Sequence, residues 1–186
     1  MASPTSNRTT YAILGLLADG PRSGYDIKRE VEETLGHFWR ESYGQIYPIL
    51  RRLHQDGLVE KQVQVRADRP NRNEYSITSD GLAELRAWLA RPVDHTPPRS
   101  ELLLKVFFGR HGDPAAIRQI VQQYGADQSQ ALTTLTSVVA RLDREATDDP
   151  SYPYWRMTAE LGLEAMTAVT TWCAHATEEL ARMETR

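Results

Sequence analysis

The sequence of 186 residues has little cysteine and no long apolar run. Its single cysteine, Cys173, cannot form an internal disulfide, which excludes both a disulfide framework and a cysteine-rich zinc site. The longest apolar stretch, Leu102–Phe108, contains Lys105 and is far shorter than the roughly 18 residues of a membrane-spanning helix. The first ten residues also lack the apolar core of a secretory signal. We therefore expect a cytoplasmic protein that does not associate with membranes.

The residue patterns that carry enzyme chemistry are also missing from the sequence. It contains neither a glycine-rich phosphate loop nor a Gly-x-Ser-x-Gly motif. Cys173 and His175 are two positions apart on a predicted helix, so their side chains point about 200° apart and cannot form a nucleophile–base pair. The five histidines do not have the spacing of metal ligands. The sequence therefore predicts neither an enzyme nor a metal or cofactor site.

What the sequence does contain is an ordinary globular composition with an uneven charge. Hydrophobic residues make up 40% and charged residues 25%, and the net charge is −3. Residues 1–91 carry 13 basic and 12 acidic side chains, whereas residues 92–186 carry 9 and 13. Within the first part, residues 42–73 hold six basic side chains against three acidic ones. This segment is the candidate for contact with an anionic partner.

A proline-rich segment divides the chain into two predicted domains. Three prolines lie between Arg91 and Pro98, where they remove backbone donors and disfavour helix. We place one domain at residues 1–91 and a second at residues 99–186. The absence of any repeat of 20 to 50 residues argues against a solenoid or a propeller.

Hydrophobic spacing predicts three helices at the start of the first domain. The first covers Tyr11–Ala18, and the second follows the capping pattern of Ser23 and Asp26 and ends near Gly36. Ser42 is expected to cap the third helix, which stops at Gly57. Pro48 predicts a kink or a late start of this helix. The predicted inward positions of the third helix are Ile46, Leu50 and Leu53.

After the third helix the hydrophobic period changes from about 3.6 to 2. Two strands are predicted, one from Val59 to Val65 and one through Tyr75 and Ile77, with a polar, basic tip between them. Thr78 is expected to cap a fourth helix with Leu82, Leu85 and Leu89 facing inward. The fold class predicted for residues 1–91 is a winged helix-turn-helix with a two-stranded wing.

The second domain is predicted to be entirely helical. A short helix covers Glu101–Phe108, and Asp113 followed by Pro114 starts a long helix that ends at Asp148-Asp149-Pro150. A second long helix is expected from Trp155. Two helices of about 30 residues cannot bury both apolar faces on each other, so we expect a second copy of the chain as a partner. The predicted inward stripes are Ile117, Val121, Tyr124, Gln128, Ala131, Leu135, Val138 and Leu142, and then Trp155, Ala159, Gly162, Met166, Val169, Cys173, Ala176, Leu180 and Met183.

The third helix and its entry segment have the composition of a DNA recognition helix. Gln45 can offer a bidentate amide to adenine, and Ser42 with the first backbone amides can bind phosphate. Tyr43 and Tyr47 can contact phosphate or a thymine methyl group. A solvated surface helix is the alternative interpretation of these residues. The basic wing residues Arg66, Arg69 and Arg72 can bind phosphates or enter the minor groove, or serve solubility alone.

Three segments of the first domain resemble the PadR family of transcriptional regulators. They are Tyr11–Ile27, Tyr43–Leu58 and Arg69–Gly81. The most specific motif is Gly-x-Ile-Tyr-Pro-x-Leu-x-x-Leu at Gly44–Leu53, which Asp-Gly-Leu follows. The second domain is similar to the helical dimerisation domain of that family by pattern. The resemblance implies DNA-contacting roles for Ser42, Tyr43, Gln45, Tyr47, Arg51 and the wing arginines Arg66, Arg69 and Arg72, and a phosphate-facing role for Tyr25.

The resemblance also implies a repressor that a small aromatic or drug-like molecule releases from DNA. Candidate effector-binding residues lie in or beside the last helix, where the same side chains could instead form plain core or interface. They are Tyr152, Trp155, Met166 and Trp172.

The sequence as a whole predicts a homodimeric, sequence-specific DNA-binding regulator that reads an inverted-repeat operator. Two alternatives remain open at this point. One is a winged-helix adaptor that does not bind DNA, and the other is a ligand-sequestering protein.

Overall fold

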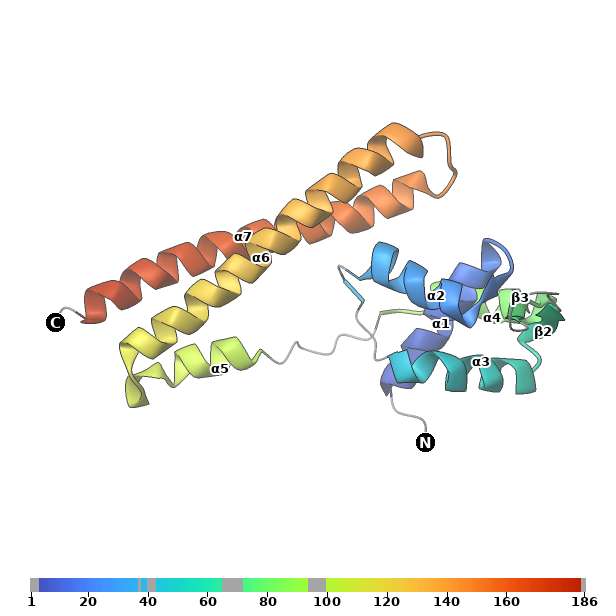
Figure 1. The fold of residues 1–186 in the computed structure, drawn as a ribbon, viewed down its shortest axis with the longest axis horizontal. Helices are drawn as coiled ribbons and strands as arrows, with labels where there is room; N and C mark the ends of the chain where they lie inside the picture. Colours follow the sequence, from blue (N-terminus) through green and yellow to red (C-terminus); the bar gives the residue numbers. More distant parts are fainter. Residues whose placement is uncertain (1–3, 37, 40–42, 65–71, 94–99, 185–186) are drawn as a thin grey trace. The chain divides into compact units, whose positions relative to one another are not determined.

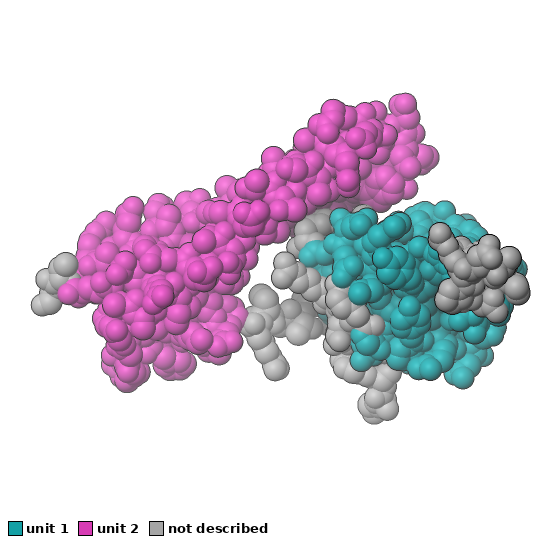
Figure 2. All heavy atoms as spheres, viewed as in Figure 1, with its two compact units in different colours: residues 1–95 teal, residues 96–186 magenta. Residues whose placement is uncertain are grey.

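The computed structural model describes residues 4–36, 38–39, 43–64, 72–93 and 100–184. The chain forms two compact units, residues 1–95 and residues 96–186, which are described separately below (Figures 1 and 2). The division between them lies inside the proline-rich segment that follows Arg91.

Unit 1 is a helical domain with a small antiparallel sheet, and it has the winged-helix fold that the sequence predicts (Figure 1). Its first helix begins seven residues before the predicted start at Tyr11, because the polar residues that precede the apolar face continue the helix. The elements of unit 1 are α1 (Pro4–Ala18), β1 (Arg22–Ser23), α2 (Gly24–Glu30), α3 (Ile46–Gln55), β2 (Val59–Gln64), β3 (Arg72–Ile77) and α4 (Ser79–Leu89).

The sheet has three strands in the order β1-β3-β2, all antiparallel. The predicted hairpin is present, with Val59 opposite Ile77 and Gln64 opposite Arg72. The third strand, β1, is a pair of residues in which Ser23 lies opposite Glu74. The sequence does not predict β1, because two residues are too few to show an alternating pattern. Its pairing joins the entry of α2 to the wing.

The start of α2 has the capping box that the sequence predicts. The Ser23 hydroxyl accepts a hydrogen bond from the Asp26 backbone amide, and the Asp26 carboxylate accepts one from the Ser23 amide. At its other end α2 continues as a π-helical turn over Val31–Leu35. The helical segment therefore stops near Gly36, as predicted.

Pro48 delays the start of the recognition helix instead of kinking it. A 3₁₀ turn over Tyr43–Gln45 precedes α3, and Pro48 is the third residue of the α-helix. In the first turn its missing amide hydrogen costs no intrahelical bond. The helix ends as predicted before Gly57, whose φ of +73° favours glycine.

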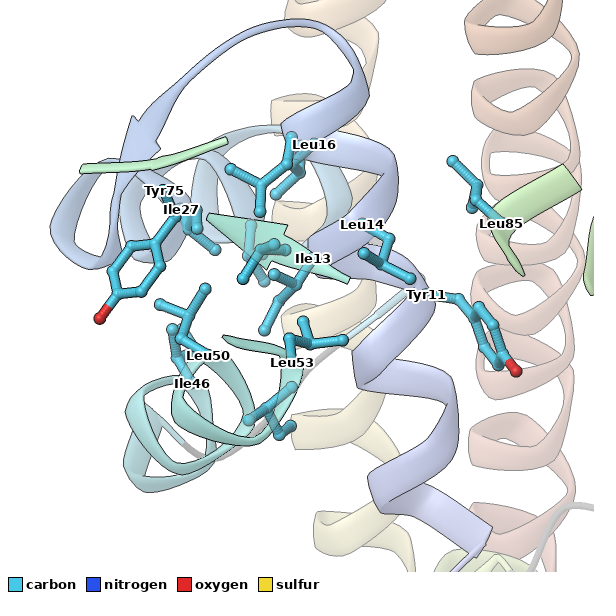
Figure 3. Close-up of a cluster of buried hydrophobic side chains, with 14 residues drawn as sticks. Tyr11, Ile13, Leu14, Leu16, Ile27, Ile46, Leu50, Leu53, Tyr75 and Leu85 are labelled. Carbon is cyan, nitrogen blue, oxygen red and sulfur yellow. The ribbon is translucent and has the colours of Figure 1, made fainter. Parts of the chain in front are cut away.

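The hydrophobic core of unit 1 lies between α1, α3 and the sheet (Figure 3). Each fully buried aliphatic side chain in it contributes about 1.5–3 kcal/mol by leaving water. The prediction that Leu89 faces this core is wrong, since it is 67% exposed. Trp88 packs there instead and stacks on Tyr11, with ring centroids 4.6 Å apart. The least exposed side chains are Ile13, Leu14, Leu17, Ile27, Leu50, Leu53 and Val59.

Unit 2 consists of α5 (Glu101–Phe107), α6 (Pro114–Glu145) and α7 (Tyr152–Glu184), with a 3₁₀ turn over Gly109–His111. The Asp113 side chain caps α6, and Pro114 occupies its first turn, as predicted. The long helices have 32 and 33 residues and pack against each other along their length (Figure 1). The observed α6 ends three residues before Asp148, and α7 starts three residues before Trp155.

The helix–helix contact departs from the predicted stripe at its aromatic positions. Tyr124 is 38% exposed, and its neighbour Gly125 is buried against Cys173. A glycine allows the two backbones to approach closely, and a tyrosine ring would hold them apart. Trp155 and Met183, also predicted to face inward, are exposed. Ala159 and Cys173 are buried as predicted.

Candidate nucleic-acid interface

One face of α3 is buried and the opposite face is polar and exposed. The side chains of Gln45, Tyr47 and Arg51 are exposed, and Tyr47 is 55% exposed. Four aliphatic side chains form the buried face, so the core holds the helix and its exposed side chains can contact another molecule. The buried side chains are Ile46, Ile49, Leu50 and Leu53.

Tyr47 also lies against the first residue of α2. A Cβ atom at Gly24 would be 2.6 Å from Tyr47 Cε1, so only glycine leaves room for the ring in this position. The next residue of α2, Tyr25, is 63% exposed. The close approach at Gly24 therefore brings the exposed tyrosines of α2 and α3 to neighbouring positions on the surface.

The pKa of Tyr75, a buried residue of β3, depends on two exposed residues of α3. Burial raises the pKa of the Tyr75 hydroxyl above its ordinary value. The nearby Tyr47 raises this pKa further, and the positive charge of Arg51 opposes the shift. The net direction is upward, so Tyr75 stays protonated at neutral pH.

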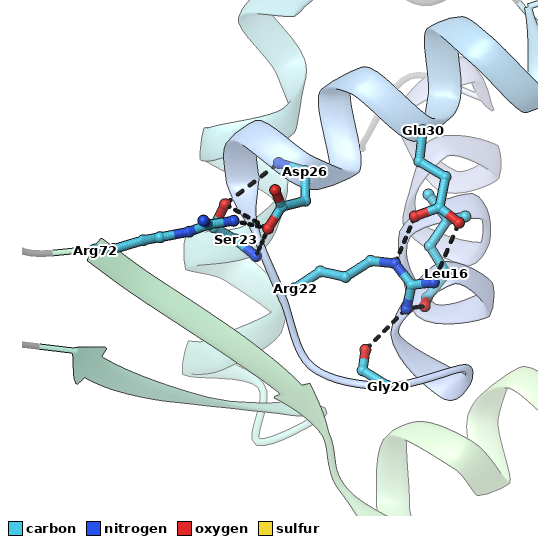
Figure 4. A network of polar contacts seen from close by, with 7 residues as sticks. All are labelled: Leu16, Gly20, Arg22, Ser23, Asp26, Glu30 and Arg72. Atoms are coloured by element: carbon cyan, nitrogen blue, oxygen red, sulfur yellow. Dashed lines mark hydrogen bonds and ion pairs between the residues drawn. The ribbon is translucent and has the colours of Figure 1, made fainter.

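A polar network joins the capping box of α2 to the wing (Figure 4). The Oδ2 atom of Asp26 accepts hydrogen bonds from the Ser23 amide at 3.0 Å and the Ser23 hydroxyl at 2.9 Å. The guanidinium of Arg72, the first residue of β3, donates to the same carboxylate oxygen. Arg72 is thus tied to α2 by an ion pair.

A second ion pair holds the segment between α1 and α2 (Figure 4). Arg22 donates to the two carboxylate oxygens of Glu30 at 2.5 and 3.1 Å. It also donates to the backbone carbonyl oxygens of Leu16 and Gly20. Figure 4 shows this pair on the side of α2 away from Arg72.

The predicted DNA contacts therefore fall into separate groups. Four of them are exposed: Tyr25 at the start of α2, Gln45 just before α3, and Tyr47 and Arg51 on α3. Arg72 is instead engaged by Asp26. The backbone of Tyr43 is part of the 3₁₀ turn before α3. Ser42, Arg66 and Arg69 lie outside the described residues.

Sequence reasoning identified Asp26 as a capping residue but missed its contact with the wing. The contact depends on β1 pairing with β3, which sets residue 26 beside a residue 46 positions later in the chain. The capping pattern and the basic wing were both visible in the sequence. Nothing in the sequence indicated that these two features meet.

The four predicted effector-binding residues do not come together along α7. The helical rise separates Tyr152 from Trp172 by about 30 Å, which is longer than a small aromatic molecule. The Tyr152 hydroxyl donates to Asp143 at 3.0 Å, and Met166 packs on the cluster of Leu135, Val139 and Ala159. Trp155 and Trp172 are 38% and 37% exposed.

Within the described part of the chain, no group of three or more His, Cys, Asp or Glu side chains could hold a metal ion. None of the described helices is long and apolar enough to cross a membrane.

The fold and the exposed helix define a winged-helix domain of the nucleic-acid-binding class, joined to a helical domain. Residues 13–87 match the transcriptional regulator PadR-like family. Residues 98–181 match the family model described as the virulence activator alpha C-terminal domain. Residues 13–87 thus form a PadR-like transcriptional regulator domain.

Two characterised relatives are similar to the chain. The negative transcriptional regulator PadR of Bacillus subtilis is 39% identical over 100 residues, which are 53% of this chain and 54% of the relative. That match thus spans about half the length of the relative. A probable transcriptional regulator of Mycobacterium tuberculosis is 28% identical over 141 residues, which are 70% of this chain and 75% of the relative.

Solved structures of Bacillus subtilis PadR are similar over a longer span. The complex of that protein with operator DNA superposes with a TM-score of 0.79 at 26% identity, covering 92% of this chain and 98% of that chain. Its complex with p-coumaric acid superposes with a TM-score of 0.74 at 26% identity, covering 97% and 99%. The winged-helix fold with long C-terminal helices is therefore shared with these regulators.

Proposed function

We propose that this protein is a homodimeric, sequence-specific DNA-binding regulator that represses transcription and is released by a small aromatic effector. The observation that carries the proposal is the exposed face of α3, where Gln45, Tyr47 and Arg51 are held outward by a buried face. The similarity to a repressor solved on its operator supports the same role.

The proposed division of labour follows the chemistry of the exposed side chains. Gln45 lies just before the first turn of α3, where an amide reads adenine, and Arg51 lies further along for guanine or phosphate. Tyr25 and Tyr47 contact the DNA backbone together with Ser42 and Tyr43. The wing arginines Arg66 and Arg69 bind phosphates or the minor groove.

Dimerisation is proposed to occur through unit 2. Large apolar side chains of this unit are exposed in the single chain, and they would be expensive to leave in water. A two-fold dimer buries them and presents two copies of α3, which fits an inverted repeat with half-sites about one helical turn, roughly 34–36 Å, apart. The exposed side chains include Leu103, Leu104, Phe107, Phe108 and Leu161.

The effector is proposed to be a small aromatic molecule that binds beside α7, near either Trp155 or Trp172. Bacillus subtilis PadR was solved with p-coumaric acid, which supports this chemical class. Since Trp155 and Trp172 are too far apart to share one molecule, one of them should report binding and the other should not. Fluorescence quenching of the Trp155→Phe and Trp172→Phe variants by p-coumaric acid distinguishes the two positions. The variant that loses its quenching identifies the tryptophan next to the effector.

The test of the proposed function is fluorescence anisotropy of labelled DNA from upstream of the protein's own coding region. A scrambled duplex serves as the control, and both are titrated at several salt concentrations. Saturable binding that prefers the upstream DNA and weakens with salt is the expected result. Equal weak binding to the upstream and scrambled duplexes would call for a second titration with duplexes selected from a random pool. If these also bind equally weakly, the adaptor alternative is favoured. Tight p-coumaric acid binding without DNA affinity would favour sequestration.

A further inference from the structure

The ion pair between Asp26 and Arg72 joins two parts of the fold that should contact DNA separately. Asp26 is in the first turn of α2, next to the exposed Tyr25, and Arg72 begins β3. Both side chains are partly buried, with 25% and 32% of their surface exposed. The same carboxylate oxygen also accepts hydrogen bonds from the amide and the hydroxyl of Ser23.

Arg72 occupies a special place in the wing. It pairs with Gln64 at the last described rung of the hairpin, and the basic tip of residues 65–71 starts from this rung. The tip carries Arg66 and Arg69. Fixing residue 72 therefore fixes the end of β3 that precedes Asn73 and pairs with Gln64.

The strand pairing explains why these residues meet. Ser23 lies opposite Glu74 in the sheet, and Arg72 is two residues before Glu74, on the same face of β3. Asp26 follows Ser23 by one helical turn. The capping box that starts α2 thus also provides the carboxylate that pairs with Arg72 of the wing.

We propose that Arg72 is a positioning residue, which the Asp26 carboxylate holds so that the wing tip is aimed at DNA, and that it is not itself a phosphate contact. This inference rests on the proposed DNA-binding function. The partly buried pair satisfies both charges within the protein, and moving the guanidinium to a phosphate would leave the Asp26 charge without its counterion beside the DNA.

The experiment measures DNA affinity for Arg72→Gln, Asp26→Asn and the double variant of the full chain. The probe is a duplex selected from a random pool by the wild-type protein, titrated at several salt concentrations. Asn at position 26 retains an oxygen for the capping bonds. Glu30→Gln is the control, because it breaks the other ion pair of this region, Arg22–Glu30, and leaves Asp26 and Arg72 paired.

The proposal predicts that Arg72→Gln and Asp26→Asn each weaken binding by about fivefold, and that the double variant is no weaker than either single one. The salt slope falls by the same amount in both single variants, because each releases the same phosphate contacts of the wing. The Glu30→Gln control leaves affinity unchanged.

Two results would overturn the proposal. If Arg72 binds phosphate, Arg72→Gln reduces the salt slope by about 0.9 per half-site, and Asp26→Asn leaves binding unchanged or tighter. If the pair serves stability alone, all variants bind DNA as the wild type does and only their unfolding temperatures fall.

A measurement without DNA separates this proposal from the proposed function. Hydrogen exchange of peptides covering residues 60–75 should be faster in Asp26→Asn and in Arg72→Gln than in Glu30→Gln, with unit 2 unaltered. Unchanged exchange in this peptide refutes the positioning role, whether or not DNA binds. Failure of the wild-type protein to prefer any duplex refutes the proposed function instead, and the exchange result still decides the role of the pair.

Discussion

Gly81 lies in the first turn of α4, where the backbone of the preceding hairpin leaves no room for a side chain. A Cβ atom there would be 2.1 Å from the Leu58 carbonyl oxygen. Because that obstacle is backbone, the Gly81→Ala variant should lose about 2 kcal/mol of unfolding free energy. Gly15→Ala is the matched control. A Cβ at Gly15 meets nothing within 4 Å, so a helix-interior alanine there should add about 0.5–1 kcal/mol. Denaturant unfolding of both variants is the measurement, and equal stabilities would refute the tight contact.

Tyr11 links α1 to the end of α4 through its hydroxyl group. Burial raises the pKa of this hydroxyl, and its hydrogen bond to Glu84 at 2.8 Å raises it further. Arg91 donates to the same hydroxyl at 3.3 Å and shifts the pKa in the opposite direction. The net direction is upward, so the folded state holds this proton more tightly than the unfolded state.

The raised pKa of Tyr11 gives a prediction for alkaline pH. The stabilising contribution is complete below the ordinary tyrosine value near 10 and is lost as the pH rises through the higher folded value. Tyr11→Phe should lower the free energy of unfolding by about 1 kcal/mol at neutral pH. It should also make the decline of this free energy above pH 10 shallower. Tyr154→Phe, at a position that is 69% exposed, is the control and should change neither. An unaltered alkaline limb in Tyr11→Phe would contradict this assignment.

Gln45 and Arg69 should affect DNA binding in different ways. Gln45→Ala should reduce the preference for the selected duplex over single-base variants at one position by about 1–3 kcal/mol. Arg69→Ala should weaken all duplexes alike and lower the salt slope by about 0.9 per half-site. Competition anisotropy with a panel of single-base variants measures both effects. An equal loss of preference in the two variants would contradict this division of labour.

At the scale of elements, the sequence predicted most of the fold because most elements have a strong local signal. The capping residues Ser23, Thr78 and Asp113 all start helices, and the switch of period after Gly57 marks the hairpin. The two-residue strand β1 had no such signal. Its partner lies some 50 residues away, so its existence depends on tertiary pairing.

The sequence predicted the part of the candidate site that depends on local periodicity, but not the part that depends on long-range pairing. The exposed face of α3 follows from helical periodicity, which sets Tyr47 and Arg51 away from the buried leucines. The engagement of Arg72 by Asp26 does not follow from periodicity, because it requires the long-range pairing of β1 with β3. Unit 2 gives a second example, because the heptad pattern predicted that Tyr124 faces α7. The closest contact is instead made by the next residue, Gly125.

The contact between α6 and α7 should protect the thiol of Cys173. This residue is 3% exposed, and burial raises the pKa of its thiol, so the reactive thiolate is disfavoured. A Cβ at Gly125 would be 2.9 Å from Cys173 Cβ. Gly125→Ala should therefore strain the contact by about 1.4 kcal/mol and speed the reaction with a disulfide reagent about tenfold. Ala126→Ser, at the exposed neighbouring position, should react as the wild type does. Equally slow reaction of all three proteins would show that the helices do not meet at Gly125.

At the scale of the whole molecule, the proposed dimer would bury the exposed apolar side chains of unit 2. We expect a particle of about twice the chain mass of 21.1 kDa in sedimentation velocity. Phe107 is 79% exposed in the single chain, so Phe107→Lys should weaken the dimer at least tenfold by placing a charge in the interface. Thr136→Lys adds the same charge to an exposed polar position of α6 and should remain dimeric. A monomeric wild-type protein at micromolar concentration would contradict the dimer.

The central claim is that two winged-helix units of one dimer read a specific operator. Anisotropy titration of the wild-type protein against a selected duplex and its scrambled counterpart, across a salt series, tests it most directly. We predict a preference of about a thousandfold or more for the selected duplex and a linear fall of log affinity with log salt. Equal affinity for both duplexes at every salt concentration would contradict the account.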